Sequence, residues 1–161
     1  MPQFLKQSGK RSVKYCELEK EKRSKDAVGE LVNVWEDSVK ATHSFLKSSD
    51  IESIKQYVPQ ALKEVPHLVV AIDDDDKFEG FIGIDGQKIE MLFVSSSCRG
   101  HGIGRSLLCE AIDRYQVKEV VVNEENTSAR GFYEHMGFQV YARSETDEQG
   151  GPFPILFMKK L

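Results

Sequence analysis

The sequence predicts an α/β domain built around a mixed β-sheet of about seven strands. Short apolar segments rich in β-branched residues alternate along the chain with longer segments whose apolar residues recur at helical spacing. Near the middle, the apolar segment 89–94 leads through a glycine-rich turn into an amphipathic segment over 103–115, and a second apolar segment, 119–123, follows. A helix that joins two strands makes them parallel, whereas short turns elsewhere favour antiparallel neighbours.

Length and composition predict one domain of ordinary size. The chain has 161 residues, of which 40% are hydrophobic and 30% charged. Residues 1–11 are polar and basic, so we expect a loose N-terminus before a single domain over 12–161. The net charge of −4 does not favour nucleic acid as a partner. No apolar run reaches the roughly 20 residues of a membrane span, so we expect no membrane partner.

The three cysteines indicate a reducing compartment. Cys16, Cys98 and Cys109 are odd in number, far apart and not spaced as metal ligands, so we expect reduced thiols and no metal site. The N-terminal segment lacks the apolar core and cleavage site of a secretory signal. We therefore expect a cytoplasmic protein.

In the first half of the chain, strands and helices follow from periodicity and from turn residues. We expect a strand over 13–18, a helix over 27–46 and a second helix that begins with a capping box at Ser49 and Glu52. Asp85-Gly86 is a signal for a two-residue hairpin. Further strands are expected over 67–72, 78–84, 89–94, 119–123, 139–143 and 153–158, with helices over 103–115 and after Asn126.

The turn over 99–105 has the chemistry of an anion site, because glycines open the way to the unpaired N–H groups of a helix N-terminus. A Walker loop needs a lysine after its last glycine, and none is present. The dinucleotide fingerprint needs two residues between its second and third glycines, but only Ile103 separates Gly102 from Gly104. A third pattern, Arg/Gln-x-x-Gly-x-Gly/Ala, is met by Arg99, Gly102 and Gly104.

A second motif, Asn-x-x-Ala-x-x-x-Tyr-x-x-x-Gly-Phe, occupies residues 126–138. With the glycine turn, it resembles the GNAT superfamily of N-acetyltransferases, and the two motifs with the strands between them span about residues 82–140. The element order β-α-α-β-β-β-α-β-α-β-β is similar to that of the GNAT fold. The resemblance implies helices on both faces of the sheet and a splay between the two parallel strands that admits the coenzyme.

The resemblance also implies acetyl-CoA as co-substrate and assigns residues to it. Asn126 would hydrogen-bond the pantetheine arm, beside Ala129 and Phe132. Backbone groups of Leu92, Phe93 and Val94 would bind the acetyl carbonyl and the upper pantetheine. The pyrophosphate would bind the backbone N–H groups of the turn formed by Arg99, Gly100, His101, Gly102, Ile103, Gly104, Arg105 and Ser106.

Two catalytic roles follow from position. Tyr133 falls where the family's tyrosine protonates the departing thiolate, and a phenol of pKa near 10 suits that step. Glu90 is the candidate base, because strict alternation along its strand places Glu90, Leu92 and Val94 on one face. His43 is an alternative base or an acceptor contact, and a water molecule is a third possibility.

We therefore expect direct transfer of an acetyl group from acetyl-CoA to a primary amine in a ternary complex. His43, Trp35 and Phe45 would contact the acceptor, since a subgroup of small bacterial family members has a similar Thr-His segment and a similar loop over 143–154. The alternative is a non-catalytic acyl-CoA-binding or regulatory module with the same fold. A polyamine, an aminoglycoside, an amino acid, a peptide N-terminus and a protein lysine remain open as acceptors, and so does a homodimer.

Overall fold

The computed structural model describes residues 12–161, so the loose N-terminus expected over 1–11 lies outside the described residues. One sheet of seven strands forms its centre, in the order β1-β2-β3-β4-β5-β7-β6. Every pair of neighbours is antiparallel except β4 and β5, which are parallel, so the expected mixed sheet is confirmed. The strands are β1 Lys14–Glu17, β2 His67–Ile72, β3 Phe78–Asp85, β4 Lys88–Val94, β5 Glu119–Asn123, β6 Phe138–Ser144 and β7 Ile155–Lys160.

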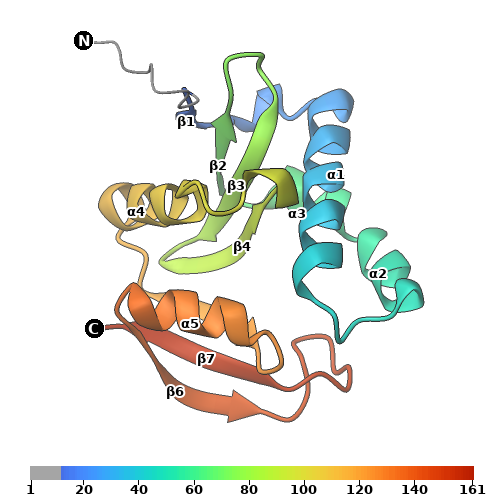
Figure 1. Ribbon diagram of the computed structural model, residues 1–161, viewed down its shortest axis with the longest axis vertical. Helices are drawn as coiled ribbons and strands as arrows, with labels where there is room; N and C mark the ends of the chain where they lie inside the picture. Colours follow the sequence, from blue (N-terminus) through green and yellow to red (C-terminus); the bar gives the residue numbers. More distant parts are fainter. Residues whose placement is uncertain (1–11) are drawn as a thin grey trace.

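Helices cover both faces of the sheet, as expected. The α-helices are α1 Lys25–Thr42, α2 Ser48–Lys55, α3 Val58–Glu64, α4 Ile103–Tyr115 and α5 Thr127–His135, and the short 3₁₀ turns are η1 Lys20–Lys22 and η2 Ser96–Cys98. On one face, α4 lies over the half of the sheet that contains β2 to β4, and α5 lies over the other half (Figure 1). On the opposite face, α1 to α3 pack on Leu68, Val70 and Phe81 in a second apolar cluster.

The expected second helix is two helices. α2 ends at Lys55 and α3 begins at Val58, because Pro59 has no N–H to bond the carbonyl of Lys55 and its ring crowds that carbonyl. The capping box expected at Ser49 and Glu52 is wrong. The helix begins two residues earlier, with Lys47 as its N-cap, and the carboxylate of Asp50 accepts the backbone N–H of Lys47 at 2.9 Å.

The first helix ends four residues earlier than expected. α1 stops at Thr42, and His43 adopts φ −106° and ψ 63°, outside the helical region. The backbone N–H of His43 still donates to the carbonyl of Val39 at 2.8 Å. The early exit leaves the His43 side chain at the end of the helix, where it can face the strands.

A bulge in β4 changes the faces of its residues. Gly83 pairs with Met91 but Ile84 pairs with Ile89, so Glu90 is the extra residue. The expectation that Glu90 shares a face with Leu92 and Val94 is therefore wrong. Glu90 lines a surface cavity together with Met91 and residues at and after α3: Ala61, Glu64, Val65 and Pro66.

The parallel strands separate, as expected. β4 and β5 pair only at Lys88–Glu119 and Ile89–Val120. Leu92 and Val94 of β4 thus lie beyond the last paired position, and their backbone faces a gap instead of a neighbouring strand.

The turn between β3 and β4 is a two-residue hairpin, as expected, but it lies one position later. Asp85 pairs with Lys88, so the two central residues of the turn are Gly86 and Gln87 and not Asp85 and Gly86.

Candidate active site

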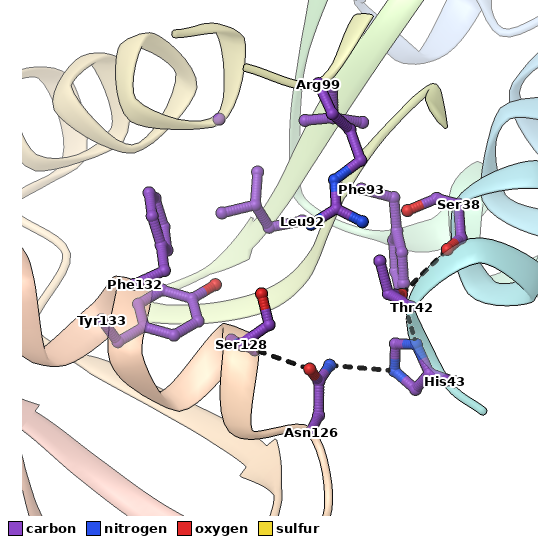
Figure 2. A pocket seen from close by; sticks show the side chains of 13 residues that line it. Ser38, Thr42, His43, Leu92, Phe93, Arg99, Asn126, Ser128, Phe132 and Tyr133 are labelled. Atoms are coloured by element: carbon purple, nitrogen blue, oxygen red, sulfur yellow. Dashed lines mark hydrogen bonds between the residues drawn. The ribbon is translucent and has the colours of Figure 1, made fainter. Parts of the chain in front are cut away.

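A cavity of about 250 Å³ opens where β4 and β5 have parted (Figure 2). Its walls come from the end of α1, the second half of β4, the turn before α4 and the first turns of α5. Three of the residues that line this cavity, Ser38, Thr42 and Ser128, were not predicted from the sequence. The other ten lining residues were predicted site residues: His43, Leu92, Phe93, Val94, Arg99, Gly104, Asn126, Ala129, Phe132 and Tyr133.

A second cavity of about 200 Å³ occupies the same gap nearer the paired ends of the strands. It adds Glu90 and Asn123 to the residues that face the gap. The two cavities share six lining residues: His43, Leu92, Phe93, Asn126, Ala129 and Tyr133. Two molecules that enter from different sides would therefore meet at one wall.

The glycine turn places the N-terminus of α4 at the wall of a third cavity, of about 240 Å³. Gly102 caps the helix in the left-handed conformation, with φ 78°, which other residues adopt at a cost. A Cβ on Gly104 would lie 3.7 Å from Val94 Cγ2 and 3.9 Å from Phe132 Cζ, so a longer side chain would enter the space between them. Gly100, Ile103 and Arg105 line the same space, in which the first N–H groups of the helix favour an anion.

Two residues of the predicted pyrophosphate site, His101 and Ser106, do not line this third cavity. The backbone N–H of Ser106 already donates to the carbonyl of Gly102 at 3.0 Å, so the backbone role assigned to Ser106 is wrong. The reason is that α4 begins at Ile103, which makes Ser106 the first residue whose amide bonds within the helix. The side chain of His101 is exposed.

Tyr133 is buried beneath the cavity, with 5% of its surface exposed. Its ring packs edge-on against Phe132 and Phe138, at centroid distances of 5.1 and 5.5 Å, and its hydroxyl points into the cavity (Figure 2). Burial raises the pKa of this phenol above its usual value near 10. The hydroxyl therefore keeps its proton at neutral pH, which suits a proton donor.

A chain of hydrogen bonds crosses from α5 to α1 (Figure 2). Asn126 Oδ1 accepts the backbone N–H of Ala129 at 3.1 Å, so the amide nitrogen is the atom that faces His43 Nε2, at 3.3 Å. On the other side of the imidazole, Nδ1 lies 2.7 Å from Thr42 Oγ1, whose hydroxyl donates to the carbonyl of Ser38 at 2.8 Å. Every donor then meets an acceptor only if His43 is neutral and protonated at Nδ1.

The surroundings of His43 agree with the neutral form. Burial lowers the pKa of the imidazole below its usual value near 6.5. Its ring contacts Phe45 and Phe93, at centroid distances of 5.3 and 6.5 Å, and neither ring supplies a charge. His43 is thus a half-buried neutral imidazole whose Nε2 lies at the wall of both cavities.

The remaining predicted residues lie at different depths. The side chain of Glu90 is 36% exposed and lies 3.7 Å from Lys88 Nζ, so it sits at the mouth of the second cavity. Phe45 contacts His43 and, at a centroid distance of 6.2 Å, Phe153. Trp35 is only 4% exposed and belongs to the apolar core between α1 and the sheet. We therefore assign Trp35 to packing and correct its expected role as an acceptor contact.

Hydrogen bonds to Asp37, which were not predicted from the sequence, hold the segment before α4 in place. The carboxylate of Asp37 on α1 accepts the backbone N–H of Ser96 at 2.6 Å and the hydroxyls of Ser96 and Ser95 at 2.9 and 3.3 Å. These bonds lower the pKa of Asp37, the backbone N–H of Ser96 contributing most. They cap η2 and join α1 to the segment that leads into the glycine turn.

Residues 24–160 match the family model described as an acetyltransferase (GNAT) domain. The chain belongs to this family, and it is an N-acetyltransferase that uses acetyl-CoA as its acetyl donor. Among residues 12–161, no group of three His, Cys, Asp or Glu residues is placed to hold a metal ion. The same part of the chain contains no helix long and apolar enough to cross a membrane.

Two curated relatives extend the comparison. The peptidyl-lysine N-acetyltransferases YjaB of Salmonella typhimurium LT2 and Escherichia coli K12 are each 40% identical over 136 residues, which is 84% of this chain and 93% and 92% of theirs. The solution structure of apo YjaB from Escherichia coli superposes with a TM-score of 0.81 at 35% identity, covering 93% of this chain and 98% of that one. The PaiA N-acetyltransferase of Thermoplasma acidophilum, solved with coenzyme A, has the same fold, with a TM-score of 0.69 at 23% identity over 92% of this chain and 98% of that one.

Proposed function

We propose that the protein transfers the acetyl group of acetyl-CoA directly to the ε-amine of a lysine in a polypeptide. The observation that carries the proposal is the wall shared by the two cavities, at which a thioester from one side and an amine from the other would come into contact. The names of the two curated relatives support a peptidyl lysine as acceptor. Among the described residues that line these two cavities there is no cysteine, which favours direct transfer over an acyl-enzyme.

In this proposal the donor occupies the first cavity and the glycine turn. The pyrophosphate binds the N-terminus of α4, where Gly104 lets the ligand approach and Arg99 adds a cation. The pantetheine arm lies along the open edge of β4, whose backbone groups at Leu92 and Val94 face the gap. The thioester then ends beside Tyr133.

The proposed chemistry needs one proton acceptor and one proton donor. Tyr133 donates to the departing thiolate, since its hydroxyl is protonated and faces the cavity. His43 accepts a proton from the lysine ammonium, because its Nε2 lies at the shared wall and burial keeps the imidazole neutral. Glu90 is the alternative base, and a Glu90→Gln variant with a wild-type pH–rate profile would exclude it.

An acidic and aromatic surface beside the site supports a basic acceptor segment. A cavity of about 430 Å³ between α2 and the β6–β7 loop is lined by Asp50, Asp147, Tyr57 and Phe153. Phe153 contacts Phe45, which contacts His43, so this surface is continuous with the site. Residues that flank the target lysine would bind here, and positive charge on them would be attracted to the two carboxylates.

The experiment offers the protein a blocked peptide with one lysine, the same peptide with arginine instead, free lysine amide and spermidine. Thiol release gives the rate, and mass spectrometry locates the acetyl group. We expect the lysine peptide to have the highest kcat/KM and the arginine peptide to be inert. A higher kcat/KM for spermidine or for lysine amide would contradict a polypeptide acceptor.

We also propose a reducing, cytoplasmic location. Cys16, Cys98 and Cys109 are all free thiols, and Cys16 is exposed. An exposed thiol that forms no disulfide is typical of proteins kept under reducing conditions.

A further inference from the structure

We infer that Thr42 is a positioning residue for catalysis: its hydroxyl holds His43 in the Nδ1-protonated tautomer, so that Nε2 is the atom that receives the proton of the acceptor amine. This inference rests on the proposed function for the identity of the amine. The hydrogen-bond donors and acceptors around the imidazole, however, are already arranged in this way in the substrate-free protein (Figure 2).

The direction of each hydrogen bond around His43 follows from the two backbone groups at the ends of the hydrogen-bond network, the carbonyl of Ser38 and the N–H of Ala129. At one end, the carbonyl of Ser38 can only accept, so Thr42 Oγ1 must donate to it and is left with lone pairs for the imidazole. At the other end, the N–H of Ala129 can only donate, so the Asn126 side chain presents its amide nitrogen to His43. The imidazole therefore accepts at Nε2 and donates at Nδ1, 2.7 Å from Thr42 Oγ1.

The geometry makes Thr42 the stronger of the two contacts. The distance from Nδ1 to Thr42 Oγ1 is 2.7 Å, whereas the distance from Nε2 to Asn126 Nδ2 is 3.3 Å. Thr42 is the last residue of α1, and its hydroxyl bonds one turn back along the same helix, so the helix fixes its rotamer. An incoming ammonium N–H can replace the longer Asn126 contact while the shorter one stays in place.

The charged and titratable groups that face His43 are few. Arg99 and Tyr133 share the first cavity with it, and Glu90 and Tyr133 share the second. The contacts from α1 and from the segment after it, Thr42 and Phe45, are uncharged. Within residues 12–161 no carboxylate bonds Nδ1, so the Thr42 hydroxyl is the acceptor that holds the proton on this nitrogen.

The proton balance of the transfer is complete with these groups. The lysine ammonium loses one proton to His43 Nε2, and its nitrogen then forms the bond to the thioester carbon. When the carbon–sulfur bond breaks, Tyr133 gives its proton to the thiolate. The second proton of the nitrogen restores Tyr133, and the imidazolium returns its proton to solvent.

The test compares Thr42→Val, which has the same shape without a hydroxyl, with Thr42→Ser, which keeps the hydroxyl. Nitrogen-15 NMR of the histidine side chains, assigned with a His43→Gln variant, reports the tautomer of His43. The rate of peptide acetylation as a function of pH reports catalysis. We expect Nδ1–H in the wild type and in Thr42→Ser, and a shift toward Nε2–H in Thr42→Val with kcat lower by roughly tenfold or more.

Three results would overturn the inference: Nε2–H in the wild type, an unchanged tautomer and kcat in Thr42→Val, or an equal loss of kcat in both variants. The last result would mean that Thr42 acts only through packing. If the wild type acetylates no lysine peptide, the proposed function fails, but the NMR comparison still decides the tautomer.

Discussion

The side chains of Asn126 and His43 join the two halves of the site, with Asn126 Nδ2 3.3 Å from His43 Nε2. Asn126 is also the N-cap of α5, because its Oδ1 accepts the N–H of Ala129. One amide thus caps the start of the helix that follows β5 and contacts the imidazole that follows α1. Replacing the amide nitrogen of Asn126 by an oxygen, as in Asn126→Asp, keeps the helix cap but changes the contact with His43.

Asn126→Asp keeps the cap and reverses the contact with His43. A carboxylate oxygen would face Nε2, so we expect the pKa of His43 to rise from its lowered value toward or above 6.5, because the imidazolium gains a partner. An NMR titration of the coenzyme-free protein measures this shift. In the wild type, the unfolded chain binds more protons between the lowered pKa and 6.5, so the free energy of unfolding decreases as the pH falls through that window. An unchanged His43 pKa in Asn126→Asp would contradict the contact.

Tyr133→Phe removes the proposed acid and little else, since the ring keeps its contacts with Phe132 and Phe138. We expect kcat to fall by roughly ten- to a hundredfold or more, the usual contribution of a general acid. The dissociation constant of acetyl-CoA, measured by calorimetry, should stay near that of the wild type. A wild-type kcat would remove Tyr133 from the mechanism.

Gly104→Val should block the coenzyme, because its side chain would enter the space between Val94 and Phe132. A clash of about 1–3 kcal/mol corresponds to an affinity for acetyl-CoA roughly five- to a hundredfold weaker. Gly104→Ala is the matched control, since a Cβ there makes only ordinary contacts. Equal affinities of the two variants would show that the coenzyme does not pass Gly104.

Asp37→Ala removes the carboxylate that caps η2. We expect a loss of about 1 kcal/mol, as for other caps, and a melting temperature lower by roughly 2–4 °C at pH 7. Because the pKa of Asp37 is lowered on folding, its contribution is present above the unfolded value near 3.9 and is lost as the pH falls through the folded pKa. The difference from the wild type should therefore vanish in acid. Asp74→Ala, in the exposed β2–β3 turn, is the control and should not change the melting temperature.

The fold was predictable where local pattern and global structure agree. The apolar strands, the helix over 103–115 and the crossover that makes β4 and β5 parallel all follow from periodicity and connection length. The bulge at Glu90 was not, because a bulge adds one residue without changing the composition of the strand. Strict alternation therefore placed the Glu90 carboxylate on the wrong face.

Site residues that belong to a sequence motif could be predicted, whereas residues that reach the site only through tertiary contacts could not. Arg99, Gly104, Asn126 and Tyr133 meet in one cavity, as their two motifs indicated. Thr42 gave a local signal, since it directly precedes His43, but its bond depends on where α1 ends. Trp35 was wrongly predicted to contact the acceptor. It lies on the apolar face of α1, and most of that face is buried in the core.

The central claim is that acetyl-CoA binds in the gap between β4 and β5, with its thioester at the wall that faces the acceptor. A titration of nitrogen-15-labelled protein with acetyl-CoA tests it most directly, read from the backbone amides. The account predicts saturable shifts centred on Phe93, Gly104 and Asn126, and in Gly104→Val saturation should need a higher concentration of acetyl-CoA. Saturable binding that leaves these three amides unshifted would contradict it.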